Sequence, residues 1–269
     1  MQKRMTREEN WMEESASTGT LGKAVAVLDA IARADHPVKF RDLRAQIGQP
    51  PGTLHRNLSN LMKEGLVRAN PDNSYALGYR LLTFASAAWA SNRFREIAEP
   101  HLRALHEQTG ETVHLGVLEG VEVIYLDKVE SRQAVRMHSQ IGKASPAYCT
   151  GVGKAALSIL PGDEMRLRVN SIDYHAFTPA TIVSAQDLEA KLDVIAHDGF
   201  AFDDEEHEVG IHCAAAPIHS PDKSFVGGIS VTAPSYRVSR EQLETWIPLV
   251  VNAAKAINQD ISIQLGPRA

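Results

Sequence analysis

One stretch, QPPGTLHRNLSNLMKEG at residues 49–65, limits most strongly what this chain can be. Its residues Leu54, Leu58 and Leu61 recur at helical spacing and predict a helix that packs inward along one side. Another side carries donors and acceptors suited to base edges and phosphates, with no carboxylate before Glu64. The pattern is typical of a DNA-recognition helix and also of an ordinary solvated helix face, so the flanking segments decide. The polar face consists of Thr53, Arg56, Asn57, Asn60 and Lys63.

The segments around this helix complete a recognisable order of elements. Upstream, apolar residues at helical spacing predict a helix over 21–33, and a second short helix ends at Gly48. Only residues 48–51 then connect the second helix to the third, as a helix-turn-helix requires. Downstream, two apolar pieces flank NPDNS at 70–74 and predict a β-hairpin. Three helices followed by a hairpin predict a winged helix-turn-helix, whose wing brings Arg68 to phosphates or to the minor groove.

The charges of the chain divide unevenly. Residues 1–95 hold 14 Lys and Arg against 9 Asp and Glu, whereas residues 96–269 hold 14 against 24. A basic head on an acidic body suits a protein whose head binds DNA, and it also suits an ordinary uneven surface. No apolar run approaches the roughly 20 residues that span a bilayer, and the charged start is not a secretory signal. The two cysteines, Cys149 and Cys213, lack metal or disulfide spacing, so we expect a cytoplasmic protein without a membrane segment.

Beyond the hairpin, the sequence predicts a linker and a second domain. Residues 79–92 form an Ala-rich apolar helix, too hydrophobic for a flexible linker. We expect it to pack against a partner subunit or the head, with packing inside one chain as the alternative. The remainder alternates strands with helices, including a helix over 184–197 and a long final helix opened by a capping box at Ser239. Such a pattern is typical of an α+β domain with a largely antiparallel sheet.

Three stretches of this second part could carry chemistry. Residues 149–154, CTGVGK, place small residues at a helix start, where backbone N–H groups can hold a carboxylate or simply pack closely. The acidic run at 202–208 is most simply a solvated face, although His207 and His212 keep a zinc site open. The predicted strand at 210–218 has small side chains on one face, which leaves room for something beside the sheet.

The motifs of common enzymes are missing. The sequence contains no P-loop, dinucleotide fingerprint or Gly-x-Ser-x-Gly elbow. Cys213 would need an activating base to act as a nucleophile, and no motif places one beside it. Two other classes stay open, namely a hydrolase or lyase using Cys213, His212 and Asp203, and a metal sensor using His207, His212 and Cys213. We predict no catalytic residue, no cofactor and no metal.

Six stretches, which together span nearly the whole chain after its first residues, point to one family: LGKAVAVLD at 21–29, the segment 51–65, YALG at 75–78, GVGKA at 151–155, GFAFDDEEH at 199–207 and GIHCAAAPI at 210–218. Their sequences resemble the IclR family of bacterial transcriptional regulators, and the last two stretches are highly specific to that family. One departure is Pro51-Gly52, where family members usually carry a polar pair such as Lys-Ser that contacts phosphate.

The resemblance implies an α+β protein with a winged helix-turn-helix, a linker helix that dimerises, and a GAF-like effector domain with an antiparallel sheet. It also implies a repressor of a catabolic operon that a short oxo acid, hydroxy acid or semialdehyde releases, with an activator as the alternative. The expected boundaries are a disordered leader over 1–19, the winged helix-turn-helix over 20–78, the linker helix over 79–94 and the effector domain over 95–265.

The expected partner is double-stranded operator DNA. We expect a homodimer or a dimer of dimers, because one winged helix reads too few base pairs to find a single site in a genome. Arg56 is expected to contact a base, and Lys63 and Arg68 to hold phosphates. The candidate DNA contacts are Thr53, His55, Arg56, Asn57, Asn60, Lys63 and Arg68.

The resemblance also implies an effector pocket. We expect N–H groups near residues 151–153 to hold a carboxylate, and Asp203 and the Cys213 thiol to meet the polar far end of the ligand. Met137, Val152 and Ile211 would contact its carbon chain. The candidate effector contacts are Ala134, Met137, Gly151, Val152, Asp203, Ile211 and Cys213.

Overall fold

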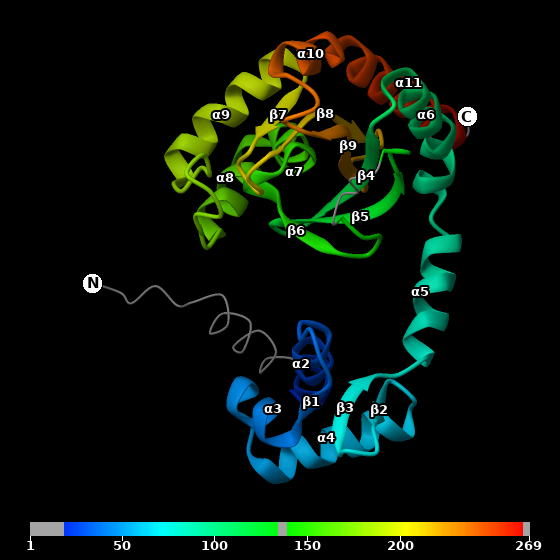
Figure 1. Cartoon of the computed structure of the whole chain (residues 1–269), viewed down its shortest axis with the longest axis vertical. Coiled ribbons are helices and arrows are strands. Elements are labelled where there is room, and N and C mark those ends of the chain that lie inside the picture. Colours follow the sequence, from blue (N-terminus) through cyan, green and yellow to red (C-terminus); the bar gives the residue numbers. More distant parts are fainter. Residues whose placement is uncertain (1–18, 134–138, 266–269) are drawn as a thin grey trace. The chain divides into compact units, whose positions relative to one another are not determined.

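The computed structural model describes residues 19–133 and 139–265 (Figure 1). The chain divides into two compact units, of which one ends at Ser91 and the other begins at Asn92. Residues 1–18 of the leader expected over 1–19, and the expected strand over 134–137, lie outside the described residues, while Gly19 begins the first described helix. No helix in the described ranges is long and apolar enough to cross a bilayer.

The N-terminal unit has the predicted order of a winged helix-turn-helix. Its helices are α2 (Gly19–Ala32), α3 (Phe40–Ile47), α4 (Pro51–Lys63) and α5 (Arg80–Ala90). Its strands are β1 (Val38–Lys39), β2 (Val67–Ala69) and β3 (Ser74–Leu77), which form an antiparallel sheet in the order β1-β3-β2. The short extended piece before the second helix is therefore the third strand of the wing.

Local signals fix the turn and the wing. Gly48 ends α3 in the left-handed conformation at φ 66°, and its N–H donates to the carbonyl of Arg44. Pro51 occupies the first position of α4, where a missing N–H costs nothing. In the wing, the Asp72 carboxylate accepts from the N–H and the hydroxyl of Ser74, at 3.1 and 2.6 Å. The core of the unit includes the fully buried Val27, Leu43 and Leu54.

The C-terminal unit is built on a six-stranded antiparallel sheet in the order β6-β5-β4-β9-β8-β7. The strands are β4 (Thr112–Glu119), β5 (Glu122–Val129), β6 (Ala144–Pro146), β7 (Ala201–Asp204), β8 (Ile211–His219) and β9 (Val226–Pro234). The helices are α6 (Arg93–Thr109), η1 (Ala147–Cys149), α7 (Gly151–Ser158), α8 (Gly162–Ser171), α9 (Ala185–Asp198), α10 (Arg240–Thr245) and α11 (Ile247–Leu265).

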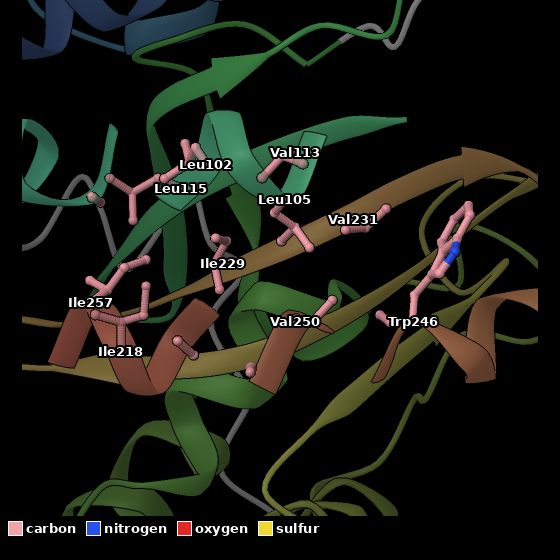
Figure 2. Packing of buried hydrophobic residues seen from close by; sticks show 14 of the residues in the cluster. Leu102, Leu105, Val113, Leu115, Ile218, Ile229, Val231, Trp246, Val250 and Ile257 are labelled. Carbon is pink, nitrogen blue, oxygen red and sulfur yellow. The ribbon is translucent and has the colours of Figure 1, made fainter. Parts of the chain in front are cut away.

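Alternation along the strands separates two packed faces. Leu105 of α6 and Val250 of α11 pack against Val113, Ile229 and Val231 of the sheet (Figure 2). Because successive side chains of a strand point to opposite faces, the residues between these apolar ones face the other side. There α7 covers β8 and β9, with α9 packed behind it (Figure 1). The candidate ligand residues belong to this second face.

The final helix differs from the predicted one. The serine cap is present, since the Ser239 hydroxyl accepts from the N–H of Gln242 at 3.2 Å. The helix that it opens is not continuous, because α10 stops at Thr245 and α11 starts at Ile247. Pro248 explains the break, since a proline within a continuous helix would remove a backbone hydrogen bond but is tolerated in a first turn.

Candidate functional site

The outward side of α4 is the first candidate site. The three leucines predicted to pack inward are buried, at no more than 5% exposure. His55, Arg56, Asn60 and Lys63 are exposed, and Thr53 is partly exposed. In the wing, the exposed Arg68 donates to the Asn70 side chain at 3.0 Å, and its guanidinium lies 5.5 Å from the centre of the Tyr79 ring. The geometry presents a polar helix surface and a cationic wing within one unit.

Asn57 is the exception, and its prediction as a DNA contact is wrong for the conformation described. Its side chain is 1% exposed, and its Nδ2 donates to Oε1 of Gln49 at 3.0 Å. Gln49 in turn donates from Nε2 to the carbonyl of Lys23 at 2.8 Å, which ties the turn to α2. The spacing explains the error, because residue 57 stands three after Leu54 and four before Leu61 and so lies on the inward face. Asn57 holds the helix-turn-helix together.

A cavity of about 120 Å³ beside the start of α7 is the second candidate site. Five of the predicted effector residues line it, while Ala134 and Met137 lie outside the described residues. Sequence reasoning missed much of the rest of the lining. The five predicted residues are Gly151, Val152, Asp203, Ile211 and Cys213, and the missed ones include His114, Tyr125, Ser139, Ser145, Ser230 and Thr232.

The missed residues named above share one feature, apart from Ser139 in the segment between β5 and β6, since they come from strands of the sheet. Every strand of the six contributes at least one polar side chain to the cavity. The signal in the sequence is a polar residue at an alternate position of an apolar strand, such as His114 between Val113 and Leu115. In sheet order these residues are Ser145, Tyr125, His114, then Ser230 and Thr232, then Cys213, then Asp203.

Glycine allows α7 to approach the sheet. A Cβ on Gly151 would stand 2.5 Å from Sγ of Cys213 and 3.6 Å from the backbone nitrogen of Asp203. A Cβ on Gly153 would stand 2.3 Å from the backbone of Ala147. Asp203 and Cys213 therefore lie at the same end of the cavity as the N-terminus of α7. They do not lie at the opposite end, where the sequence hypothesis placed them.

Burial sets the charge of this end. Asp203 is 7% exposed, and burial raises its pKa to about 7 against the opposing effect of nearby Lys154. Its Oδ1 accepts from the N–H of Glu206 at 2.9 Å. Lys154 is fully buried and forms an ion pair with Glu206. The hydroxyl of Thr181 donates to the carbonyl of Glu206 at 2.6 Å, so the loop before α9 holds this turn in place.

The cysteines are poor nucleophiles. Burial raises the pKa of both Cys149 and Cys213 to about 12, so both carry their protons near neutral pH. His212 neighbours Cys213 in β8 and therefore points to the opposite face of the sheet. In the described ranges, no group of three or more His, Cys, Asp and Glu side chains is placed to hold a metal ion.

The two sites together define a class of protein, a winged helix-turn-helix regulator with a separate domain for a small ligand. Protein-family models match both units of the chain and narrow this class to one family. The IclR helix-turn-helix domain matches residues 20–71, and the bacterial transcriptional regulator IclR C-terminal domain matches residues 87–259. The chain belongs to the IclR family of bacterial transcriptional regulators.

Similar proteins span nearly the whole chain. The transcriptional repressor IclR of Escherichia coli is 32% identical over 241 residues, covering 88% of both chains. A solved IclR regulator from Silicibacter shares 26% identity with a TM-score of 0.78 and covers 93% of this chain and 98% of its own. An IclR homologue from Microbacterium hydrocarbonoxydans, solved in complex with 4-hydroxybenzoate, has a TM-score of 0.74 at 23% identity and covers 91% and 100%. The first two of these relatives are named as transcriptional regulators.

Proposed function

We propose that this regulator represses a catabolic operon as a dimer and leaves its operator when a short organic acid or semialdehyde binds the cavity beside α7. The observation that carries the proposal is the cavity itself, lined by polar side chains and by a helix N-terminus. Its volume of about 120 Å³ is well below the roughly 300–1,000 Å³ of pockets for drug-sized ligands, so it suits a ligand of a few heavy atoms.

The acid group has two sources of positive potential at the cavity. The first turn of α7 presents backbone N–H groups at Gly151 and Val152, where a helix dipole favours an anion. The exposed Lys143 also lines the cavity. Asp203, with its raised pKa, can carry a proton and donate it to the same carboxylate. A solved homologue with a bound carboxylic acid supports a ligand of this chemical class.

On the DNA side, α4 would enter the major groove and the wing would lie against the backbone. We assign base reading to Arg56 with Thr53, His55 and Asn60 beside it, and phosphate binding to Lys63 and Arg68. Exposure of the helix residues supports this assignment. The absence of Ser at Gly52 leaves the start of α4 to bind phosphate through backbone N–H groups alone.

The linker supports the proposed dimer. No residue of α5 is buried, and its large apolar side chains include Leu82 and Phe84, which are 66% and 50% exposed. A second copy of the chain would remove these apolar side chains from water and place two α4 helices on one operator. Ligand release then requires only that the acid bind the DNA-incompetent arrangement more tightly.

The experiment is a gel shift of the full-length protein on the DNA upstream of its own gene, with short oxo acids, hydroxy acids and semialdehydes added singly. We expect a sequence-specific shift that one compound reverses. A shift that every compound leaves intact contradicts the effector half of the proposal. If the protein binds the DNA only when a compound is present, the response is instead of the activator type.

Two variants test the cavity directly. Asp203→Ala with Cys213→Ala should abolish the response to the compound and leave the gel shift intact, because both side chains border α7 and neither belongs to the head. Thr245→Val, on the exposed end of α10, is the matched control. If the response survives in the double variant, the cavity is not the effector site.

A further inference from the structure

Tyr125 of β5 is the bulkiest of the described side chains that line the cavity beside α7. It stands directly opposite Gly116 of β4, and Gly116 in turn stands opposite Gly228 of β9. These two glycines leave the sheet bare on this row, and α7 uses the space, because a Cβ on Gly116 or Gly228 would lie 3.0 or 3.4 Å from Cγ1 of Val152. Tyr125 therefore forms a wall of the cavity beside the helix.

The ring of Tyr125 is held in place from two sides. His114 lies two residues before Gly116 in β4, and the centre of its ring is 5.1 Å from the centre of the Tyr125 ring. The backbone is fixed as well, since the carbonyl of Tyr125 accepts from the N–H of Gly142 at 2.8 Å and its N–H donates to the carbonyl of Lys143 at 3.2 Å. To make room for a larger ligand, the ring would have to give up its contact with His114.

The hydroxyl of Tyr125 extends toward Asp203 and Cys213. In sheet order β5 is three strands away from β8, a separation of about 14 Å across a flat sheet. Burial raises the pKa of Tyr125, and the acidic groups of Cys213 and Asp203 add to that rise. The phenol is therefore near enough to be affected by both groups, which means that the ring takes up space between β5 and the start of α7.

The space that the ring leaves is small. The cavity measures about 120 Å³, whereas an engineered protein cavity of about 150 Å³ holds one benzene molecule. An aromatic acid is larger than benzene, so it cannot enter unless a wall gives way. Most of the other described lining residues are serine, threonine, glycine, valine or cysteine, which have little bulk to remove. The phenol of Tyr125, in contrast, is itself as large as the ring that would enter.

We propose that Tyr125 sets the size limit of the ligand, because its ring excludes aromatic acids and leaves room only for a short aliphatic acid. The inference rests on the proposed function and adds a residue that determines its specificity. Forcing extra atoms into a packed site drives side chains from their rotamers or shifts the backbone, and both are costly. Replacing the ring with a methyl group should therefore create binding of an aromatic acid.

The test is isothermal titration of the full-length protein with 2-oxobutyrate, 3-hydroxypropionate and benzoate. The wild-type protein should bind at least one of the two short acids, and it should bind benzoate at least about tenfold more weakly than that acid. Tyr125→Ala should bind benzoate about tenfold or more tightly than the wild-type protein does. The expected result is thus a gain of binding, which general damage to the protein cannot produce.

Tyr125→Phe is the matched control, because it keeps the ring and removes only the hydroxyl. It should exclude benzoate as the wild-type protein does. If Tyr125→Phe admits benzoate, the hydroxyl and not the bulk of the ring excludes the ligand, and the inference is wrong. Should Tyr125→Ala fail to fold, as judged by circular dichroism, Tyr125→Val makes the same measurement with a side chain that favours a strand.

The outcomes distinguish the two proposals. If the wild-type protein binds benzoate as tightly as a short acid, or if it binds a short acid while folded Tyr125→Ala still excludes benzoate, this inference is wrong and the effector cavity stands. If neither short acid binds the wild-type protein but Tyr125→Ala binds benzoate, the size limit is supported and the proposed effector class fails. Failure of all forms to bind any of the three acids contradicts both.

Discussion

The two candidate surfaces of this regulator are both polar, and they handle polarity in opposite ways. The outward side of α4 leaves its side chains in water, with Arg56, Asn60 and Lys63 exposed. The C-terminal unit buries its polar groups in and around the cavity, so Asp203 and His114 of the lining and Lys154 near Asp203 are each less than 9% exposed. Water already solvates the first set, whereas each member of the second needs a partner or must lose its charge. Substitutions of these exposed side chains of α4 should therefore alter DNA binding. Substitutions of the buried polar groups in the C-terminal unit should alter its stability and titration.

The largest difference should appear in the unfolding free energy, when removal of a buried charge is compared with removal of an exposed one. Lys154→Ala leaves Glu206 buried without its partner and should cost about 3–5 kcal/mol of unfolding free energy in the C-terminal unit. Arg166→Ala breaks the exposed pair with Asp163 and should leave the transition unchanged. Urea denaturation followed by circular dichroism measures both.

A second variant checks the cause of that loss. Lys154→Met combined with Glu206→Leu removes both charges and should recover much of the stability, because neither partner of the ion pair is left buried and charged. If Lys154→Ala unfolds at the same urea concentration as Arg166→Ala, the interior of this unit is wetter than the structure indicates and the contrast between the two regions fails.

In the head, the next largest effect concerns sequence preference. Arg56→Ala should reduce discrimination between the operator and unrelated DNA by about 1–3 kcal/mol, the value of a bidentate arginine–guanine contact. Lys63→Ala should weaken binding to all sequences and lower the salt dependence by about one counterion. Fluorescence anisotropy on both DNAs over a range of salt gives the two quantities. Equal loss on every sequence for Arg56→Ala would make it a backbone contact.

Asn57 and Asn60 provide the same contrast between a buried and an exposed polar side chain within one helix, α4. Asn57→Ala should destabilise the head by about 1–2 kcal/mol, because Gln49 loses its buried partner. Asn60→Ala, three residues on and exposed, should leave stability unchanged and alter only DNA affinity. Thermal unfolding and anisotropy of both variants make the comparison. A stability loss in Asn60→Ala that equals the loss in Asn57→Ala would contradict it.

The sequence was informative about the head because the signals there are local. Helical spacing, the stop at Gly48 and the Asn/Asp turn of the wing each act over a few residues, and they predicted the observed order of elements. The prediction for Asn57 failed because polarity was given more weight than its spacing from Leu54 and Leu61. A polar amide side chain is expected at the surface, and the hydrogen bond to Gln49 is what offsets the cost of burying Asn57.

The cavity was only half predictable, for a physical reason. Residues at the start of α7 and in β7 and β8 lie in stretches whose sequence resembles the family, so they could be predicted as ligand contacts. His114 and Thr232 could not, because their meeting depends on β4 pairing with β9, which lies far along the chain. A single polar residue in an apolar strand can be assigned to a cavity only when the strand order is known. The same order explains why Asp203 and Cys213 share one end of the cavity.

The smallest expected effect is the pH dependence of ligand binding. Asp203 has a pKa raised to about 7 by burial, so it becomes charged as the pH rises through neutrality and then repels an anionic acid beside α7. Between pH 6 and pH 8 the affinity for the acid should fall about tenfold, because the protonated fraction of a carboxyl group with a pKa of about 7 falls by about that factor over this range. Asp203→Asn should remove that dependence, and titration calorimetry at the two pH values measures it.

Stability supplies an independent check of the same group. Because the pKa of Asp203 is higher in the folded chain than its ordinary value of 3.8, the folded state holds this proton more tightly than the unfolded state. The wild-type protein should therefore lose stability relative to Asp203→Asn as the pH rises from about 4 to 7, and the difference should level off above that. The opposite slope would mean that the Lys154 ion pair and the Glu206 N–H outweigh burial at this carboxyl group. The C-terminal cavity would then resemble the head, with a polar group that keeps its charge, and ligand binding would show no step near neutral pH.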